Sequence, residues 1–78
     1  MQQTVLVTGA SSGLGKSISF HLHSLGYTVI GTSRSPHKYT DLPFPLLALD
    51  LSSQASIDLF FAELATKITR LDVLVNNA

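Results

Sequence analysis

Short apolar runs alternate with longer segments of helical periodicity along this chain. The runs at residues 4–8, 28–33, 46–49 and 73–75 are rich in Val, Leu and Ile and too short for helices, so they predict four strands. Because most of their positions are apolar, we expect both faces of the resulting sheet to be covered, which is typical of parallel strands. The segments between them then form right-handed crossovers, and the fold class is α/β.

Two of the connecting segments carry apolar residues at helical spacing. The stripe expected on the first helix comprises Leu14, Ile18, Leu22 and Leu25. Gly26 follows it as a helix-ending residue. Ser52 or Ser53 is expected to cap the second helix. Its predicted buried stripe comprises Ile57, Phe60, Phe61, Leu64 and Ile68.

Residues 34–45 hold all three prolines of the sequence. Ser35 followed by Pro36 predicts a capped helix of one or two turns, because proline suits the first helical position. Pro43 and Pro45 prevent a longer helix.

The passage from the first strand into the first helix runs through Gly9, Gly13 and Gly15. Glycine permits positive φ angles and leaves no side chain between the backbone and a ligand. A helix that starts at such a turn presents free N–H groups and the positive end of its dipole, which favours an anion, most often a phosphate. The parallel strands would bring the residues that follow them to one edge of the sheet, which is the predicted site.

Composition narrows the classes of function. The chain is 45% hydrophobic and 13% charged, and its five basic and five acidic residues give no net charge. This balance argues against a nucleic-acid surface or a polybasic membrane patch. The sequence contains no cysteine and no apolar run of the roughly 20 residues needed to cross a bilayer. We therefore expect a cytoplasmic protein without a metal site, since the three histidines lack metal-like spacing.

The glycine spacing indicates a family. The common fingerprint G-x-G-x-x-G fails, because position 18 is Ile18. The sequence Thr8-Gly9-x-x-x-Gly13-x-Gly15 instead resembles the coenzyme-binding motif of the classical short-chain dehydrogenases/reductases. Asp50-Leu51 and the stretch from Leu71 to Asn76-Asn77-Ala78 stand where that family has matching motifs, so the resemblance covers the whole chain.

The resemblance implies the N-terminal half of a doubly wound (Rossmann) sheet, with four parallel strands in the order 3-2-1-4 and two long helices. Residues 1–78 would then form an incomplete NAD(P)-binding domain. It also implies roles for residues at each strand end. Those expected to wrap the pyrophosphate are Gly9, Ser11, Ser12, Gly13, Leu14 and Gly15. Asp50, with Leu51 beside it, would accept a hydrogen bond from the adenine amino group, and those expected to line the adenine ribose are Asn76, Asn77 and Ala78.

The end of the second strand distinguishes NADP from NAD. An acidic residue there would bind the ribose 2′-hydroxyl of NAD and repel a 2′-phosphate. The strand ends instead in Ser33-Arg34. A guanidinium group can form a forked, charge-assisted contact with a phosphate. We therefore predict NADP rather than NAD as the cofactor.

The family's catalytic serine, tyrosine and lysine would all lie C-terminal to residue 78. Tyr27 and Tyr39 are not followed by lysine four positions later, so neither fits the family's Tyr-x-x-x-Lys motif. We expect the 78 residues to be a truncated part of an enzyme, inactive alone. The resemblance implies that the intact enzyme acts on a small alcohol or carbonyl substrate, and that it forms a homo-oligomer.

Two other functions remain open at this point. Ala10-x-x-x-x-Gly15-Lys16-Ser17 matches the phosphate-loop pattern of nucleotide hydrolases except at its first glycine, and Asp50 could then coordinate magnesium. A non-catalytic dinucleotide-binding module would use the same half-domain. Magnesium-dependent binding of ATP or GTP would favour the nucleotide hydrolase. A parent reading frame without Tyr-x-x-x-Lys would favour the non-catalytic module.

Overall fold

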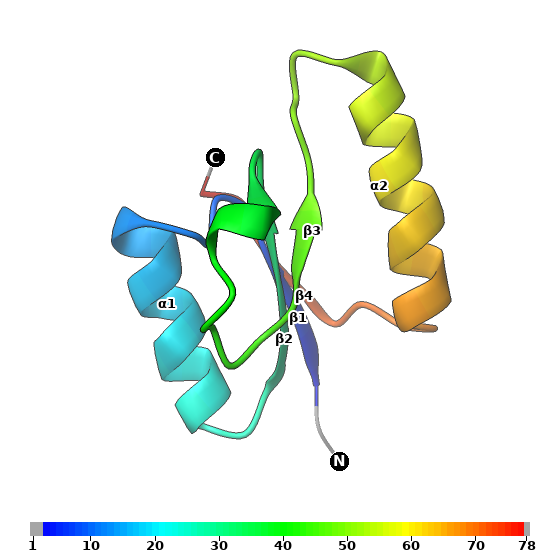
Figure 1. The fold of residues 1–78 in the computed structure, drawn as a ribbon. Coiled ribbons are helices and arrows are strands. Elements are labelled where there is room, and N and C mark those ends of the chain that lie inside the picture. Colours follow the sequence, from blue (N-terminus) through cyan, green and yellow to red (C-terminus); the bar gives the residue numbers. More distant parts are fainter. Residues whose placement is uncertain (1–2, 78) are drawn as a thin grey trace.

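The computed structural model describes residues 3–77, and Figure 1 labels the strands and helices found there. In chain order the elements are β1 (Thr4–Val7), α1 (Gly13–Ser24), β2 (Thr28–Ser33), the 3-10 turn η1 (Pro36–Lys38), β3 (Leu46–Ala48), α2 (Gln54–Lys67) and β4 (Val73–Val75). β2 and β4 have the predicted bounds. β1 and β3 each end one residue earlier than predicted, which is a small correction at strand ends.

The four strands form one parallel sheet in the order β3-β2-β1-β4, as predicted. Val5 of β1 stands opposite Val29 of β2 on one side and Val73 of β4 on the other. α1 covers one face of the sheet and α2 covers the other (Figure 1). This is the arrangement that right-handed crossovers produce when the strand order reverses beside β1.

Alternate residues of the strands supply two cores, one on each face of the sheet. The core on the α1 side comprises Val5, Val7, Ala10, Val29 and Phe44. The core on the α2 side comprises Leu6, Ile30, Leu47 and Phe60. Both faces of the inner strands are therefore buried, which explains why their sequences are apolar at successive positions.

The stripe predicted on α1 is wrong at both ends. The side chains of Leu14 and Leu25 are 68% and 61% exposed, whereas Gly15 and Ser19 are buried. Small residues at the centre of the contact let the helix backbone approach the sheet closely. Leu22, from the middle of the stripe, is partly buried and packs against the core.

In α2, Ser53 is the N-cap and its Oγ accepts a hydrogen bond from the Ser56 amide at 3.2 Å, which decides between the two predicted caps. Phe60 is buried, but the prediction for Phe61 is wrong because its side chain is 60% exposed. Consecutive helical residues point about 100° apart, so both cannot face the sheet. At η1, Pro36 begins a single 3-10 turn, and the Ser35 side chain makes no capping hydrogen bond within residues 3–77.

The turn between β1 and α1, the chain after β2 and the end of β4 lie at the same edge of the sheet, at the top of Figure 1. The amino ends of the strands lie at the opposite edge. No helix among the described residues has the length and apolar character needed to cross a membrane.

Candidate functional site

The turn after β1 is fixed by β2. The Gly9 amide donates to the Thr32 hydroxyl at 3.1 Å, and the Ala10 amide donates to the Thr32 carbonyl at 3.0 Å. Gly9 has φ of 66°, which a residue with a Cβ rarely adopts. Thr32 is 3% exposed, so both hydrogen bonds are made by a buried residue on a central strand.

The N-terminus of α1 follows this turn directly. Ser12 is the N-cap, and its side chain makes no capping hydrogen bond within residues 3–77. The first helical amides have no partner inside the helix, and the first turn contains no acidic side chain. Gly13 has φ of 58°, and a Cβ built there would meet no atom within 4 Å. With no side-chain cap within residues 3–77 and no acidic group in its first turn, this helix end is suited to an anion, so the residues present fit a dinucleotide diphosphate.

Gly15 has a different environment. A Cβ at this position would collide with the Gly9 carbonyl and the Asn77 side-chain amide. The Ser19 hydroxyl, on the next turn, donates to the Gly15 carbonyl at 2.8 Å. Gly15 therefore allows the first turn of α1 to pack against the end of β1, with no room for a larger residue.

The end of β4 is tied to the same turn. The Asn77 amide donates to the Thr8 hydroxyl at 2.8 Å, and the Asn77 side chain donates to the Gly9 carbonyl at 3.3 Å. The Thr8 hydroxyl lies 3.4 Å from Asn76 Oδ1. The two asparagines thus hold the edge strand against the glycine turn. Ala78, the third residue predicted here, lies outside the described residues.

A cleft of about 660 Å³ opens beside the turn, between the ends of β1, β2 and β3. This volume lies within the range of small-molecule and cofactor sites. The predicted site residues that line it are Gly9, Ser11, Ser12, Ser33, Arg34, Asp50 and Leu51. The predicted residues that do not line it are Gly13, Leu14, Gly15, Asn76 and Asn77. Leu14 is an exposed residue of α1. Gly13 and Gly15 belong to the first turn of that helix, and Asn76 and Asn77 follow β4 beside the turn at Gly9.

Asp50 is held in a turn of its own at the end of β3. Its Oδ1 accepts from the Ser52 hydroxyl at 2.6 Å and from the Ser52 amide at 3.0 Å. The Ser52 hydroxyl, followed by the Ser52 amide, lowers the pKa of Asp50 below its ordinary value; desolvation opposes them, and the Arg34 charge adds the smallest lowering effect. Asp50 is therefore an ionised acceptor at the cleft at neutral pH.

Sequence reasoning missed several residues that line the cleft. Those not predicted are Thr32, Ser35, Lys38, Tyr39, Leu49 and Ser52. Lys38 and Tyr39 reach it because η1 turns the chain back after β2. The Ser35-Pro36 signal predicted this short helix, and it could have indicated that the following residues return to the site.

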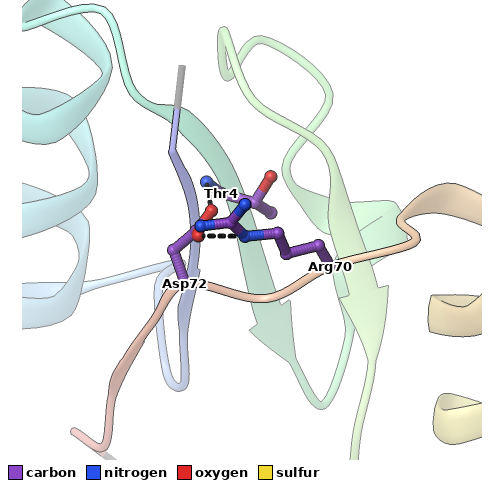
Figure 2. A network of polar contacts seen from close by, with 3 residues as sticks. All are labelled: Thr4, Arg70 and Asp72. Carbon is purple, nitrogen blue, oxygen red and sulfur yellow. Dashed lines mark hydrogen bonds and ion pairs between the residues drawn. The ribbon is translucent and has the colours of Figure 1, made fainter. Parts of the chain in front are cut away.

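A second hollow, of about 430 Å³, lies at the opposite edge of the sheet. Asp72 there accepts from the Thr4 amide at 2.8 Å and from Arg70 Nε at 2.6 Å (Figure 2). The Asp72 amide in turn donates to the Thr4 carbonyl at 3.0 Å. These contacts join the starts of β1 and β4, and none of the residues predicted for the site takes part.

A sequence profile of the family described as short chain dehydrogenase matches residues 3–78. Among curated proteins, the chain is 37% identical to an NADPH-dependent pterin aldehyde reductase of Arabidopsis thaliana, over 97% of this chain and 35% of the reductase. It is 35% identical to the NADP-dependent 3-hydroxy acid dehydrogenase YdfG of Escherichia coli, over 95% of this chain and 32% of that protein. The chain therefore spans about a third of the length of these relatives.

Solved structures agree. A short-chain dehydrogenase from Streptomyces avermitilis superposes with a TM-score of 0.82 at 38% identity, over 99% of this chain and 30% of that one. A metagenomic short-chain oxidoreductase in complex with NADP superposes with a TM-score of 0.80 at 36% identity, over 97% and 38% of the two chains. The near-match to a phosphate loop at Ala10 to Ser17 is thus a coincidence of glycine spacing. The match over nearly every residue, the strand order and the superposition together place the chain in the short-chain dehydrogenase family.

Proposed function

We propose that this chain is the coenzyme-binding part of an NADP-dependent oxidoreductase, which in the whole protein transfers hydride between nicotinamide and an alcohol or carbonyl carbon. The observation that carries the choice of NADP is the position of Arg34. It follows the last residue of β2 and lines the cleft beside Ser33, with no carboxylate at that strand end. A guanidinium there favours a 2′-phosphate, whereas NAD needs an acceptor for its 2′-hydroxyl.

The remaining binding roles are those that the family resemblance implies, and contacts around the cleft support two of them. The amides at the start of α1 would hold the diphosphate, because Ser12 leaves them without a side-chain cap. Asp50 would accept a hydrogen bond from the adenine amino group. The contacts from Ser52 to its Oδ1 lower the pKa of Asp50 and so keep the carboxylate ionised as an acceptor. The resemblance alone assigns Asn76, Asn77 and Ala78 to the adenine ribose, because Asn76 and Asn77 lie outside the cleft lining. The names of the pterin aldehyde reductase and YdfG, both dependent on NADPH or NADP, support the same cofactor.

The bound cofactor would supply the hydride, and the protein's part is to orient it. Within this chain the residues bind and position only. The catalytic serine, tyrosine and lysine of the family are expected beyond residue 78. We therefore propose that the 78 residues alone bind the adenine half of the cofactor without turnover.

Titration of the whole protein with NADPH and NADH, followed by fluorescence or calorimetry, tests the proposal. We expect the wild-type protein to bind NADPH more tightly, and Arg34→Ala to weaken NADPH binding by about tenfold or more while leaving NADH nearly unchanged. Arg34→Lys keeps the positive charge but loses the forked guanidinium, so its NADPH affinity should lie between those of the wild type and Arg34→Ala. Equal affinities for the two cofactors in the wild-type protein would refute the choice of NADP.

A further inference from the structure

We infer that Lys38 is a second cationic contact for the 2′-phosphate and thereby a determinant of cofactor specificity. This inference rests on the proposed function, since it concerns the same cleft. Within the described residues, the charged side chains that line the cleft are Arg34, Lys38 and Asp50. Lys38 is thus the one cation besides Arg34 in this lining.

The charges of the cleft favour a second cation beside a bound phosphate. A phosphate monoester carries a charge of about −1.5 to −2 at neutral pH. Arg34 is close enough to Asp50 to lower its pKa, so the field of the guanidinium is partly offset by a carboxylate. Arg34 alone therefore leaves a bound 2′-phosphate with uncompensated negative charge, and Lys38 can compensate it.

The backbone that carries Lys38 is fixed relative to β2. The Ser35 amide donates to the Ser33 hydroxyl, and the Lys38 amide donates to the Ser35 carbonyl, both at 3.1 Å. The Tyr39 amide donates to the Pro36 carbonyl, also at 3.1 Å. These contacts close the chain into η1 directly after the strand end, so Lys38 starts from a defined position on the wall of the cleft.

No salt bridge in residues 3–77 involves the Lys38 ammonium group, whereas Arg70 at the opposite edge pairs with Asp72. A lysine that lines a cleft without an acidic partner adds a positive potential there, which attracts an anionic ligand. Lys16, the other cation near the glycine turn, is exposed and does not line the cleft. Position therefore distinguishes Lys38 from the remaining lysines.

The test compares Lys38→Gln with Lys67→Gln, a matched loss of charge at the far end of α2, in the whole protein. We expect Lys38→Gln to weaken NADPH binding by about tenfold and to leave NADH binding within a factor of about two. Lys38→Arg should retain the NADPH affinity of the wild type, and Lys67→Gln should leave the affinities for both cofactors unchanged. The Lys38 side chain is exposed, so we expect Lys38→Gln to leave the stability unchanged. A melting curve that matches the wild type would establish that the variant is folded.

The results separate this inference from the proposed function. If the wild-type protein binds neither cofactor, or both equally, the proposed function or its choice of NADP fails and the inference fails with it. If the wild-type protein prefers NADPH and Arg34→Ala removes the preference while Lys38→Gln does not, only the role of Lys38 is refuted. An equal loss of NADPH and NADH affinity in Lys38→Gln would also refute it, because the phosphate is the difference between the two.

Discussion

The buried hydroxyl of Thr32 accepts the Gly9 amide hydrogen at 3.1 Å, across the two central strands of the sheet. The register places Val7 opposite Gly31, so the chain following β1 passes beside Thr32. A threonine with an inward hydroxyl thus fixes the first glycine of the turn, whose φ is positive. The Gly9 amide is occupied by this contact, and an anion would have to bind the amides further along, at the start of α1.

Replacing Thr32 by valine keeps its shape and removes the acceptor. We expect Thr32→Val to lower the free energy of unfolding by about 1 kcal/mol, because the Gly9 amide loses its partner. NADPH and NADH binding should weaken together, since the diphosphate turn is common to both. Thr32→Ser retains the hydroxyl and should recover binding in the same titrations. Full cofactor affinity in the valine variant would show that the turn is held without this hydrogen bond.

Gly13 and Gly15 should respond differently to alanine. At Gly15 the methyl group would collide with backbone atoms of Gly9, which cannot move aside as a flexible side chain can. We expect Gly15→Ala to destabilise the protein by about 3 kcal/mol, the upper part of the usual range for overpacking a core. At Gly13 the space is open and only the positive φ is unfavourable, so the loss should be about 1 kcal/mol. Thermal or urea denaturation of both variants measures the difference, and equal losses would contradict this explanation.

Much of the fold follows from local sequence. The apolar runs predicted the strands, and Ser53 caps α2 through a contact three residues away. Residues at the ends of parallel strands meet at one edge whatever their side chains, so seven of the thirteen residues that line the cleft were predictable. Thr32 and Lys38 were missed because their roles depend on strand register and on the path of η1. Helical periodicity identified an apolar face, but it did not show that Gly15 would be at the centre of the α1 contact.

Asp72 should make stability depend on pH. The Thr4 amide is the largest influence on Asp72 and lowers its pKa below the ordinary value; desolvation opposes this, and Arg70 adds smaller lowering effects. The Asp72 side chain is 9% exposed. The ionised group therefore stabilises the fold above the unfolded-state pKa of about 3.9, and this contribution is lost as the pH falls through the lower folded-state value. Asp72→Asn keeps an oxygen acceptor for Thr4 but removes the charge.

We expect Asp72→Asn to melt at a lower temperature than the wild type at pH 7, with the difference shrinking as the pH falls below about 4. Melting curves across this range check the prediction. Asp58→Asn is the matched control, because Asp58 is an exposed residue of α2 whose Oδ1 accepts a hydrogen bond from the exposed Gln54 side chain at 3.0 Å. If the difference in melting temperature between Asp72→Asn and the wild type stays constant down to pH 3, the effect does not come from ionisation of Asp72.

Ser12 offers a substitution that should improve the fold and impair the site. Asp is a strong N-cap, and its charge is favourable at a helix N-terminus that has no side-chain cap and no acidic residue in its first turn. Ser12→Asp should therefore raise the free energy of unfolding by about 0.5–1 kcal/mol.

The carboxylate of Ser12→Asp would occupy the amides proposed for the diphosphate and would repel that group, so NADPH and NADH should both bind at least about tenfold more weakly. Ser12→Ala, which removes a side chain that caps nothing within the described residues, should leave stability nearly unchanged. Denaturation and titration of the same preparations provide both measurements, and a Ser12→Asp variant that binds both cofactors normally would show that the start of α1 is not where the diphosphate binds.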